Sequence, residues 1–282
     1  MSNDDASSKP DATSAHRAYE GRVDVAGGRA RYRRLERLGR MSARARIEML
    51  LDGDSFLELQ RYHRHERDLD DALTATRAPG DGVICGIGAI HGHPVAVYAH
   101  DVTVWRGAVG EVGAEKICRL LDIAKERSLP VITLADSDGA RIAEGAYAIR
   151  GYGDVIKRTI ALSDHVPQIT LACGLCVGAA AYNAALTDFT AMVQDQSFMF
   201  ITGARVTRAM TGEEVDIADL GGDALHARTT GACHAVLESE GAGIEWVKRL
   251  LLTYALRQVE SDDPLLCVLE FEFPLVPETE RA

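Results

Sequence analysis

The sequence predicts an α/β fold built on a largely parallel sheet. Short apolar runs typical of buried strands alternate with longer segments whose apolar residues recur at helical spacing. Two of these runs, at residues 131–134 and 169–171, lead into glycine-containing turns that open helices. No repeat or long linker divides residues 21–282. Because 46% of the 282 residues are hydrophobic, we expect one domain with a sizeable core.

Charge and composition narrow the classes of partner. The net charge of −11 disfavours nucleic acid and anionic membrane surfaces, so we expect neither as a partner. A ligand with several phosphates would have to be met by local arginines. Residues 1–20 are rich in Ser, Asp and Ala and are expected to form a disordered tail. This tail is polar and acidic and has no apolar segment, so we expect no signal peptide and a cytoplasmic protein.

Six cysteines are scattered along the chain, at positions 85, 118, 173, 176, 233 and 267. A reducing compartment argues against disulfides. Cys173 and Cys176 form a CxxC pair, but no second pair completes a structural zinc site. We therefore expect no bound metal.

Two basic segments begin the ordered part of the chain. Order is expected near residues 29–38, and a helix should follow Ser42, which is a suitable N-cap. The apolar face of that helix is Ile47, Leu50 and Leu51. The pair Asp52-Gly53 should end it.

Residues 56–71 carry little core signal. The run at 56–59 is interpreted as a short connection, and residues 62–71 are too charged for a core element. His63 and His65 lie in that charged run and could be metal ligands. We expect them instead to be part of a solvated surface.

From residue 79 the pattern changes to strands and helices in alternation. Residues 82–90 and 95–100 form a predicted β-hairpin with its turn at residues 91–94. Residues 111–129 have helical spacing, and Lys116 and Arg119 on that helix are expected to be solvated. After the strand at 131–134, the turn at 136–145 and a helix at 152–163 are expected.

The uncharged stretch at residues 168–187 is the centre of the predicted fold. It is long enough for a transmembrane helix, but Gly174 and Gly178 interrupt it. We interpret it as a strand, a tight glycine turn and an Ala-rich helix. The first N–H groups of such a helix have no partner within it and suit an anion or oxyanion. A close-packed junction without a ligand is an equally good interpretation of this stretch alone.

The remaining sequence continues the alternation. Strands are expected at residues 189–193 and 197–201, and helices near residue 213 and at 243–259. His226 and His234 lie between these helices, and we expect structural roles for both because their spacing offers no catalytic partner.

Several short segments of the sequence resemble one family. They are LGRMSARARIEMLLDGDSF, GDGVICGIG, GEVGAEKI, DSDGARIAEG, GLCVGAAAY, LTDFTAMV, FMFITGA and LGGDALHARTTG, in that order between residues 38 and 235. The chain resembles the N-terminal half of the carboxyltransferase (β) subunit of biotin-dependent acyl-CoA carboxylases, with a pattern nearest to propionyl-CoA carboxylase. The resemblance implies a crotonase-like ββα superhelix built around a twisted sheet.

The resemblance also implies a site and a mechanism. The backbone N–H groups of Gly178 and Ala179 would hold the thioester oxygen while the α-carbon loses a proton and attacks CO₂. Gly139, Ala140 and Arg141 would form another turn, beside an acyl-CoA or acyl carrier protein thioester. The guanidinium would bind either a phosphate or a nearby carboxylate such as Glu144 or Asp136. No covalently bound cofactor is expected, since the carboxyl group would come from carboxybiotin on a biotin carrier protein.

Five residues depart from the family's usual pattern. Arg106 and Ala108 replace Gly and Ser, Asp138 replaces Gly, Leu175 replaces Pro, and Ala179 replaces the second Gly of a Gly-Gly pair. Alanine still offers its N–H, but its Cβ narrows the space above the turn. These changes leave open an altered acyl group, an altered reaction or a reduced activity.

The resemblance covers only the family's first half. The second half, which would hold the biotin, has no counterpart in the 282 residues. We therefore expect a carboxyltransferase component completed by a separate C-half subunit in a hetero-oligomer. Two alternatives remain: a biotin-independent decarboxylase of a malonyl-type thioester, and a non-catalytic acyl-CoA-binding subunit. The acyl group and the choice between CoA and acyl carrier protein are not determined by the sequence.

Overall fold

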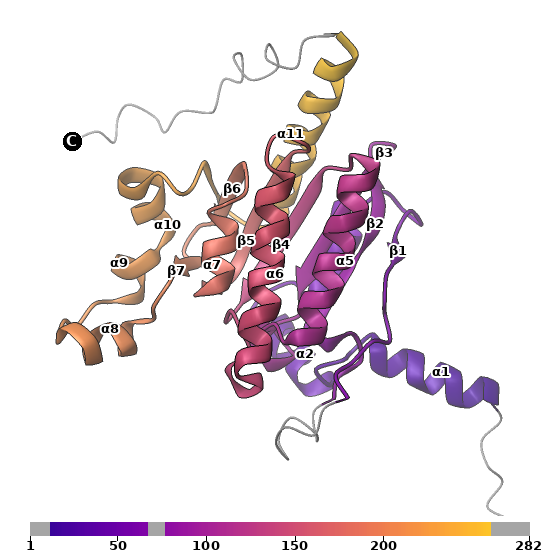
Figure 1. Ribbon diagram of the computed structural model, residues 1–282, viewed down its shortest axis with the longest axis horizontal. Helices are drawn as coiled ribbons and strands as arrows, with labels where there is room; N and C mark the ends of the chain where they lie inside the picture. The colour runs from indigo at the N-terminus through magenta and orange to yellow at the C-terminus, as the bar shows by residue number, and fades with distance from the viewer. Residues whose placement is uncertain (1–11, 67–76, 261–282) are drawn as a thin grey trace, which may run out of the picture.

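The computed structural model describes residues 12–66 and 77–260 (Figure 1). The helices are α1 Ala12–Val23, α2 Arg29–Arg37, α3 Ala43–Leu50, α5 Glu111–Arg127, α6 Ala146–Leu162, α7 Ala179–Ala184, α8 Ala204–Thr211, α9 Ile217–Gly221, α10 Asp223–Leu225 and α11 Glu240–Glu260. The strands are β1 Leu57–Glu58, β2 Val83–Ile90, β3 His93–His100, β4 Val131–Ser137, β5 Gln168–Val177, β6 Phe189–Val193, β7 Phe198–Phe200 and β8 Ala235–Leu237.

These strands form one mixed sheet. Its order is β1-β2-β3-β4-β5-β6-β8, and β7 pairs with the far end of β5. The hairpin β2-β3 is antiparallel, while β3 to β6 and β8 are parallel. The α/β fold with a largely parallel sheet is therefore confirmed. Because parallel neighbours end at the same edge, the turns after β3, β4 and β5 lie together.

Helices cover both faces of the sheet (Figure 1). One core lies between the sheet and α5, α6 and α7, with Ile117, Leu120 and Leu162 fully buried. The other core lies between the sheet and α3 and α11, and includes Ile47 and Ile244. Burying side chains of this size contributes about 1.5–3 kcal/mol each, so both faces hold the sheet in place.

Local signals in the sequence predicted several elements well. Ser42 caps α3, since its Oγ accepts from the N–H of Ala45 at 3.2 Å. The apolar face of that helix is buried as predicted. The hairpin turns at His91 and Gly92, whose N–H groups donate to the Asp52 carboxylate at 3.0 and 2.8 Å.

The N-terminal expectation was partly wrong. Residues 12–23 form α1, and residues 1–11 lie outside the described part. The helix is held by contacts that composition does not reveal. Val23 is buried, the Tyr19 ring lies 5.7 Å from that of Tyr62, and Glu20 accepts from Arg61 at 3.2 Å.

Residues 56–66 are more ordered and more buried than predicted. The expected connection contains β1, which pairs antiparallel with β2. His65 is buried beside Asp81, with 4.0 Å between Nδ1 and Oδ1, so the prediction of a solvated surface was wrong for this residue. His63 is exposed as expected. The rest of the charged run, from residue 67, lies outside the described residues.

Lys116 is also buried, contrary to the prediction of a solvated side chain. Its Nζ donates to the carbonyl oxygens of Gly80, at 2.9 Å, and Val83. Burial lowers the pKa of this lysine, because removal from water disfavours the charged form. Arg119, three residues on, is exposed.

The central stretch differs in its turn. The strand β5 runs through Gly174 and ends at Val177, so only Gly178 forms the turn. The helix that follows, α7, has six residues and is shorter than the Ala-rich run suggested. Among the described helices none is long and apolar enough to span a membrane.

Candidate active site

Two turns meet where β4 and β5 end. The first turn, at Gly139, follows β4, and the second turn, at Gly178, follows β5. Gly139 has φ +86° and Gly178 has φ +58°, both in the region that favours glycine. A Cβ at Gly139 would lie 2.4 Å from the carbonyl oxygen of Val177 and 3.5 Å from the nitrogen of Ala179. The second turn therefore packs directly against the first, and glycine is required at 139 for this approach.

The N–H groups of the two turns differ in their availability. Gly178 donates to the carbonyl oxygen of Phe200 at 2.9 Å, and Gly139 donates to Ser137 Oγ at 3.0 Å. The N–H groups of Ala140 and Ala179 have no acceptor among the described residues, and both residues are half-buried. A buried or half-buried N–H that lacks a partner is uncommon, and such groups are found at ligand sites.

A third segment is tied to the first turn. Val109 donates to the carbonyl oxygen of Gly139, and Arg141 donates to that of Val109, both at 2.8 Å. Ser137 Oγ donates to the carbonyl oxygen of Gly107 at 2.7 Å. Residues 105–109 therefore line the same edge of the sheet as the two turns.

Arg141 is buried, and both terminal nitrogens of its guanidinium are hydrogen-bonded, whereas Nε has no partner among the described residues. Its Nη1 lies 2.7 Å from both Asp81 Oδ1 and Glu144 Oε1. The same two carboxylates accept from the N–H groups of Gly113 and Glu111 at the start of α5. The guanidinium thus fixes the turn against α5 and is not accessible to a phosphate. Of the two uses predicted for it, the structure has the carboxylate pair, with Glu144 rather than Asp136.

Arg106 and Asp138 form an ion pair at the first turn. Arg106 Nη2 donates to Asp138 Oδ1 at 3.2 Å, and Nε donates to Oδ2 of the same carboxylate. The backbone N–H of Asp138 also donates to the carbonyl oxygen of Arg106 at 3.2 Å. These are two of the five departures from the family's pattern, so two separate changes in the sequence compensate each other in charge.

A buried ion network lies behind the turns. Asp136 Oδ2 accepts from Arg40 Nη2 at 2.6 Å and from Arg46 Nη1 at 3.0 Å. Arg46 Nε continues the network to Glu240 at 2.5 Å. A Cβ at Gly174 would lie 2.2 Å from Arg40 Nη2, so this glycine makes room for the ion pair instead of forming a turn.

The two thiols of the CxxC pair are not placed to act as a nucleophile or to bind one metal ion together. Cys173 lies in the core under α3 and α11, whereas Cys176 lies in the core under α5 and α6. The two thiols therefore face opposite sides of the sheet. Burial raises the pKa of Cys173 to about 12 and that of Cys176 well above its ordinary value, so neither is a thiolate near neutral pH.

Three side chains elsewhere approach one another closely enough to hold a metal ion. They are His65, Asp81 and Glu144, whose ligand atoms lie within 4.8 Å of one another. Arg141 already bonds to both carboxylates, so a cation between them would face a buried positive charge. The cluster is better explained as the support of the first turn.

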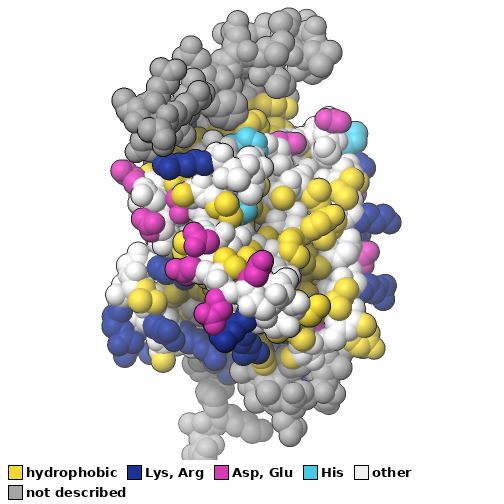
Figure 2. Space-filling view, turned by 90° about the vertical axis from the view of Figure 1, so that its left-hand side faces the viewer, with side chains coloured by type: hydrophobic (Ala, Val, Ile, Leu, Met, Phe, Trp, Pro, Cys, Tyr) yellow, Lys and Arg dark blue, Asp and Glu magenta, His cyan; other side chains and the backbone are white. Residues whose placement is uncertain are grey.

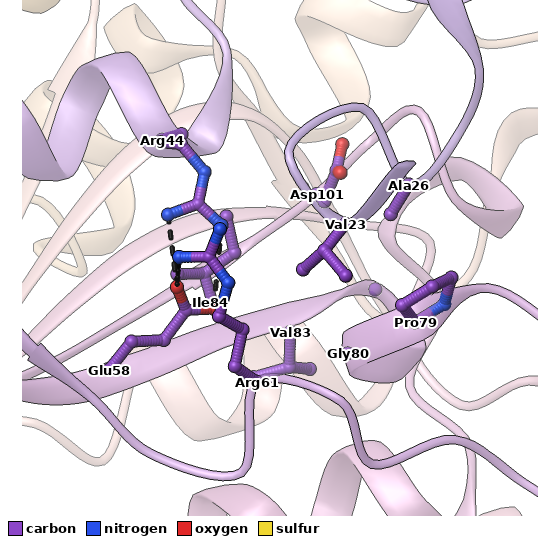
Figure 3. Close-up of a pocket in the computed structure, with 11 residues that line it drawn as sticks. Val23, Ala26, Arg44, Glu58, Arg61, Pro79, Gly80, Val83, Ile84 and Asp101 are labelled. Atoms are coloured by element: carbon purple, nitrogen blue, oxygen red, sulfur yellow. Dashed lines mark hydrogen bonds and ion pairs between the residues drawn. The ribbon is translucent and has the colours of Figure 1, made fainter. Parts of the chain in front are cut away.

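A shallow pocket lies away from the turns (Figure 3). Its charged lining includes Arg44 and Arg61, which both reach Glu58, at 3.0 and 3.1 Å. Since neither turn contributes to its lining, this pocket is separate from the candidate site.

Comparison with known proteins identifies a family for the chain. Residues 35–269 match the family described as "Carboxyl transferase domain". The chain belongs to this family. It is 42% identical over 262 residues to the propionyl-CoA carboxylase carboxyltransferase subunit of Haloferax mediterranei, covering 90% of this chain and 50% of that protein. It is 40% identical to the mitochondrial propionyl-CoA carboxylase β chain of Homo sapiens, covering 81% and 43%. The chain thus spans about half the length of the curated relatives it matches.

Solved structures agree on the fold. The transcarboxylase 12S structure with methylmalonyl-coenzyme A bound has a TM-score of 0.82 and 34% identity, and covers 88% of this chain and 48% of its own. This likeness confirms the crotonase-like fold. A chain of a Pseudomonas malonate decarboxylase hetero-tetramer has a TM-score of 0.67 and 19% identity, covering 79% of this chain and 91% of its own, which shows a shared fold alone.

The sequence interpretation located both turns but missed what supports them. It did not predict that Gly178 uses its own N–H internally, nor that Arg40, Arg46 and Asp136 pair. The pairing partners are 96 and 90 residues apart, so no local pattern could reveal them. His226 and His234 both contact the backbone: His226 Nε2 lies 2.7 Å from the carbonyl oxygen of Met199, and His234 accepts from the N–H of Thr190 at 3.0 Å.

Proposed function

We propose that this chain is the acyl-CoA-binding component of a biotin-dependent carboxyltransferase. The observation that carries the proposal is the pair of unpartnered N–H groups, at Ala140 and Ala179, on turns in direct contact. Two fixed donors suit one oxygen atom that becomes negative. The thioester oxygen of an acyl-CoA is such an atom, because loss of the α-proton makes it an enolate oxygen.

The donors would act on the transition state more than on the bound substrate. A neutral thioester oxygen accepts weakly, whereas the enolate oxygen carries most of a negative charge. The Ala179 N–H is the catalytic donor in this proposal, and Gly178 places it through its φ of +58°. The second donor is the Ala140 N–H, because the N–H of Gly178 already donates to Phe200. Gly139 and Arg141 fix the conformation of the turn that carries Ala140. Loss of one such donor typically lowers turnover by about 10²–10³-fold.

Carboxybiotin on a carrier protein would supply the carboxyl group and, after CO₂ has left, a base. The described residues at the turns include no buried thiolate or Ser-His-Asp set that could take these roles. This chain's own part is therefore to bind, orient and polarise the thioester. The biotin would be held by a partner surface, which we assign to a C-half carboxyltransferase subunit.

An exposed apolar surface supports such a partner. Large hydrophobic side chains are exposed beside the second turn, at Tyr182 on α7, Ile201 after β7, and Val206 and Met210 on α8. Figure 2 shows hydrophobic side chains gathered on the right-hand half of the side of the molecule that it presents. Surfaces of this kind are typical of protein interfaces, and covering them would also remove water from the donors.

The experiment is a comparison of two assays on the full chain with a C-half subunit. A carboxyltransferase should move labelled carboxyl from carboxybiotin to an acyl-CoA. Steady release of CO₂ from a malonyl-type thioester without biotin, and no carboxyl transfer, would support the decarboxylase instead.

A further inference from the structure

The second turn rests on β7, a strand of three residues. This strand pairs in parallel with the end of β5, from Leu175 to Val177. The carbonyl oxygen of Phe200, the last residue of β7, accepts the N–H of Gly178 at 2.9 Å. Because this bond holds Gly178, the position of β7 decides where the next N–H group, that of Ala179, points.

The opposite edge of β7 is held by few groups. Among the described residues, its strand-type pairing on that side is a single bridge between Phe198 and Gly222. Successive carbonyl groups of a strand point to opposite sides, so the carbonyl oxygen of Met199 faces away from β5. A Cβ at Gly221 would lie 2.0 Å from this oxygen, which shows how closely that segment approaches. The hydrogen bond to the oxygen comes from a side chain, that of His226, whose Nε2 lies 2.7 Å away.

The ring of His226 is held at both nitrogens. It is half-buried and begins the π-helical segment His226–Thr230. Its Nδ1 lies 2.8 Å from the hydroxyl oxygen of Thr230. A carbonyl oxygen can only accept, so Nε2 carries the proton that bonds to Met199, and Nδ1 of the neutral ring accepts from the Thr230 hydroxyl. The ring therefore presents one N–H group in a fixed direction to β7.

We propose that His226 is a positioning residue for the oxyanion donor at Ala179. The inference rests on the proposed function, because it takes the Ala179 N–H to be the donor to the enolate oxygen. His226 acts through the backbone: its Nε2 holds β7 at Met199, and the next carbonyl oxygen of that strand holds Gly178. A shift of about 1 Å in a catalytic group can lower turnover by about 10²-fold, so loosening this short strand lowers kcat.

Two variants separate the roles of the two ring nitrogens. His226→Gln places an amide near the former Nε2 and keeps a donor for Met199, whereas the shorter His226→Asn can replace Nδ1 alone. In the complex with a C-half subunit, His226→Asn should lower kcat for carboxyl transfer about tenfold with little change in KM, and His226→Gln should keep most of the activity. The control is His234→Leu, which removes the acceptor of the Thr190 N–H on β6 and leaves β7 untouched. Its kcat should not change.

Amide hydrogen exchange of the full chain gives a readout that needs no activity. In His226→Asn the amide of Gly178 should exchange about fivefold to tenfold faster than in the wild type, as the loss of one hydrogen bond behind its acceptor strand predicts, while Thr190 keeps its rate. His234→Leu should show the reverse. If His226→Asn is less stable in urea but keeps the wild-type kcat and the wild-type exchange at Gly178, the role is merely structural and the inference is wrong.

The variant Ala179→Pro separates this inference from the proposed function. If Ala179→Pro keeps carboxyl transfer, the proposed function is rejected and this inference with it. If Ala179→Pro loses transfer while His226→Asn keeps the wild-type kcat, the inference alone is rejected. Loss of kcat in both variants, with recovery in His226→Gln and faster exchange at Gly178 in His226→Asn, would support it.

Discussion

At residue 179 a donor can be removed without removing the helix. Ala179 is the first residue of α7, where proline is tolerated because its N–H has no partner within the helix. We predict that Ala179→Pro lowers kcat for carboxyl transfer by about 10²-fold, whereas KM changes little. The control is Ala179→Gly, which keeps the N–H and restores the family's residue, and should retain full activity. Equal activity of the two folded variants would refute the role of this N–H group.

The charge balance at Arg106 and Asp138 gives a second prediction. Asp138 lies two residues from Ala140, so an unpaired carboxylate there would oppose an enolate held by that N–H. We predict that Arg106→Gly lowers kcat by roughly threefold to eightfold at low salt, since the pair is partly exposed and screened. Glycine fits position 106, where φ is +55°, so folding should not suffer.

The double variant Arg106→Gly/Asp138→Gly tests whether charge causes this effect. It removes both charges and should recover wild-type kcat, while Asp138→Gly alone should show no loss. A pair with a merely structural role would give the opposite pattern, with both single variants impaired and the double variant no better. Added salt should also shrink the loss in Arg106→Gly.

At the scale of elements, the ion network behind the turns joins four parts of the chain. Asp136 on β4 holds Arg46 of α3, which holds Glu240 at the start of α11, and Gln196 links Glu240 to the carbonyl oxygen of Cys173 on β5 at 2.7 and 2.8 Å. All the charged groups but Arg40 are almost fully buried. The network thus fixes the ends of the two strands from which the turns begin.

We predict that Asp136→Asn lowers the free energy of unfolding by about 3–5 kcal/mol. The substitution leaves Arg40 without a carboxylate and Arg46 with Glu240 alone, so one positive charge of this buried network is no longer compensated. Urea denaturation measures this loss. The matched control is Asp122→Asn, which removes an exposed partner of Arg158 and should cost about 1 kcal/mol or less. Similar losses in the two variants would show that the buried network contributes no more than a surface pair.

The sequence predicted those elements whose signals are local. The cap at Ser42, the hairpin at residues 83–100 and the two glycine turns follow from neighbouring residues alone. The burial of Lys116 and the role of Gly174 could not be predicted from neighbouring residues. The lysine is buried because carbonyl oxygens more than 30 residues away accept from it, and the glycine is needed because two distant side chains meet above it. Long-range partners decide both outcomes.

At the scale of the whole molecule, the proposed function assigns one side of a site to this chain. The donors lie at the carboxyl edge of the sheet, beside α7 and α8 with their exposed hydrophobic side chains. Reaction requires the enolate carbon and the carboxyl donor to approach within about 3–3.5 Å, and a surface open to water weakens each donor. We therefore expect catalysis only when a second carboxyltransferase half covers this face.

The most direct measurement is carboxyl transfer from carboxybiotin to propionyl-CoA by the purified full chain, with and without a C-half carboxyltransferase subunit. Its mass in solution is measured in both cases. We predict no transfer by the chain alone, transfer in the complex, and loss of that transfer with Ala179→Pro but not with Ala179→Gly. Full transfer by the chain alone as a monomer, or unchanged transfer in the Ala179→Pro complex, would contradict this account.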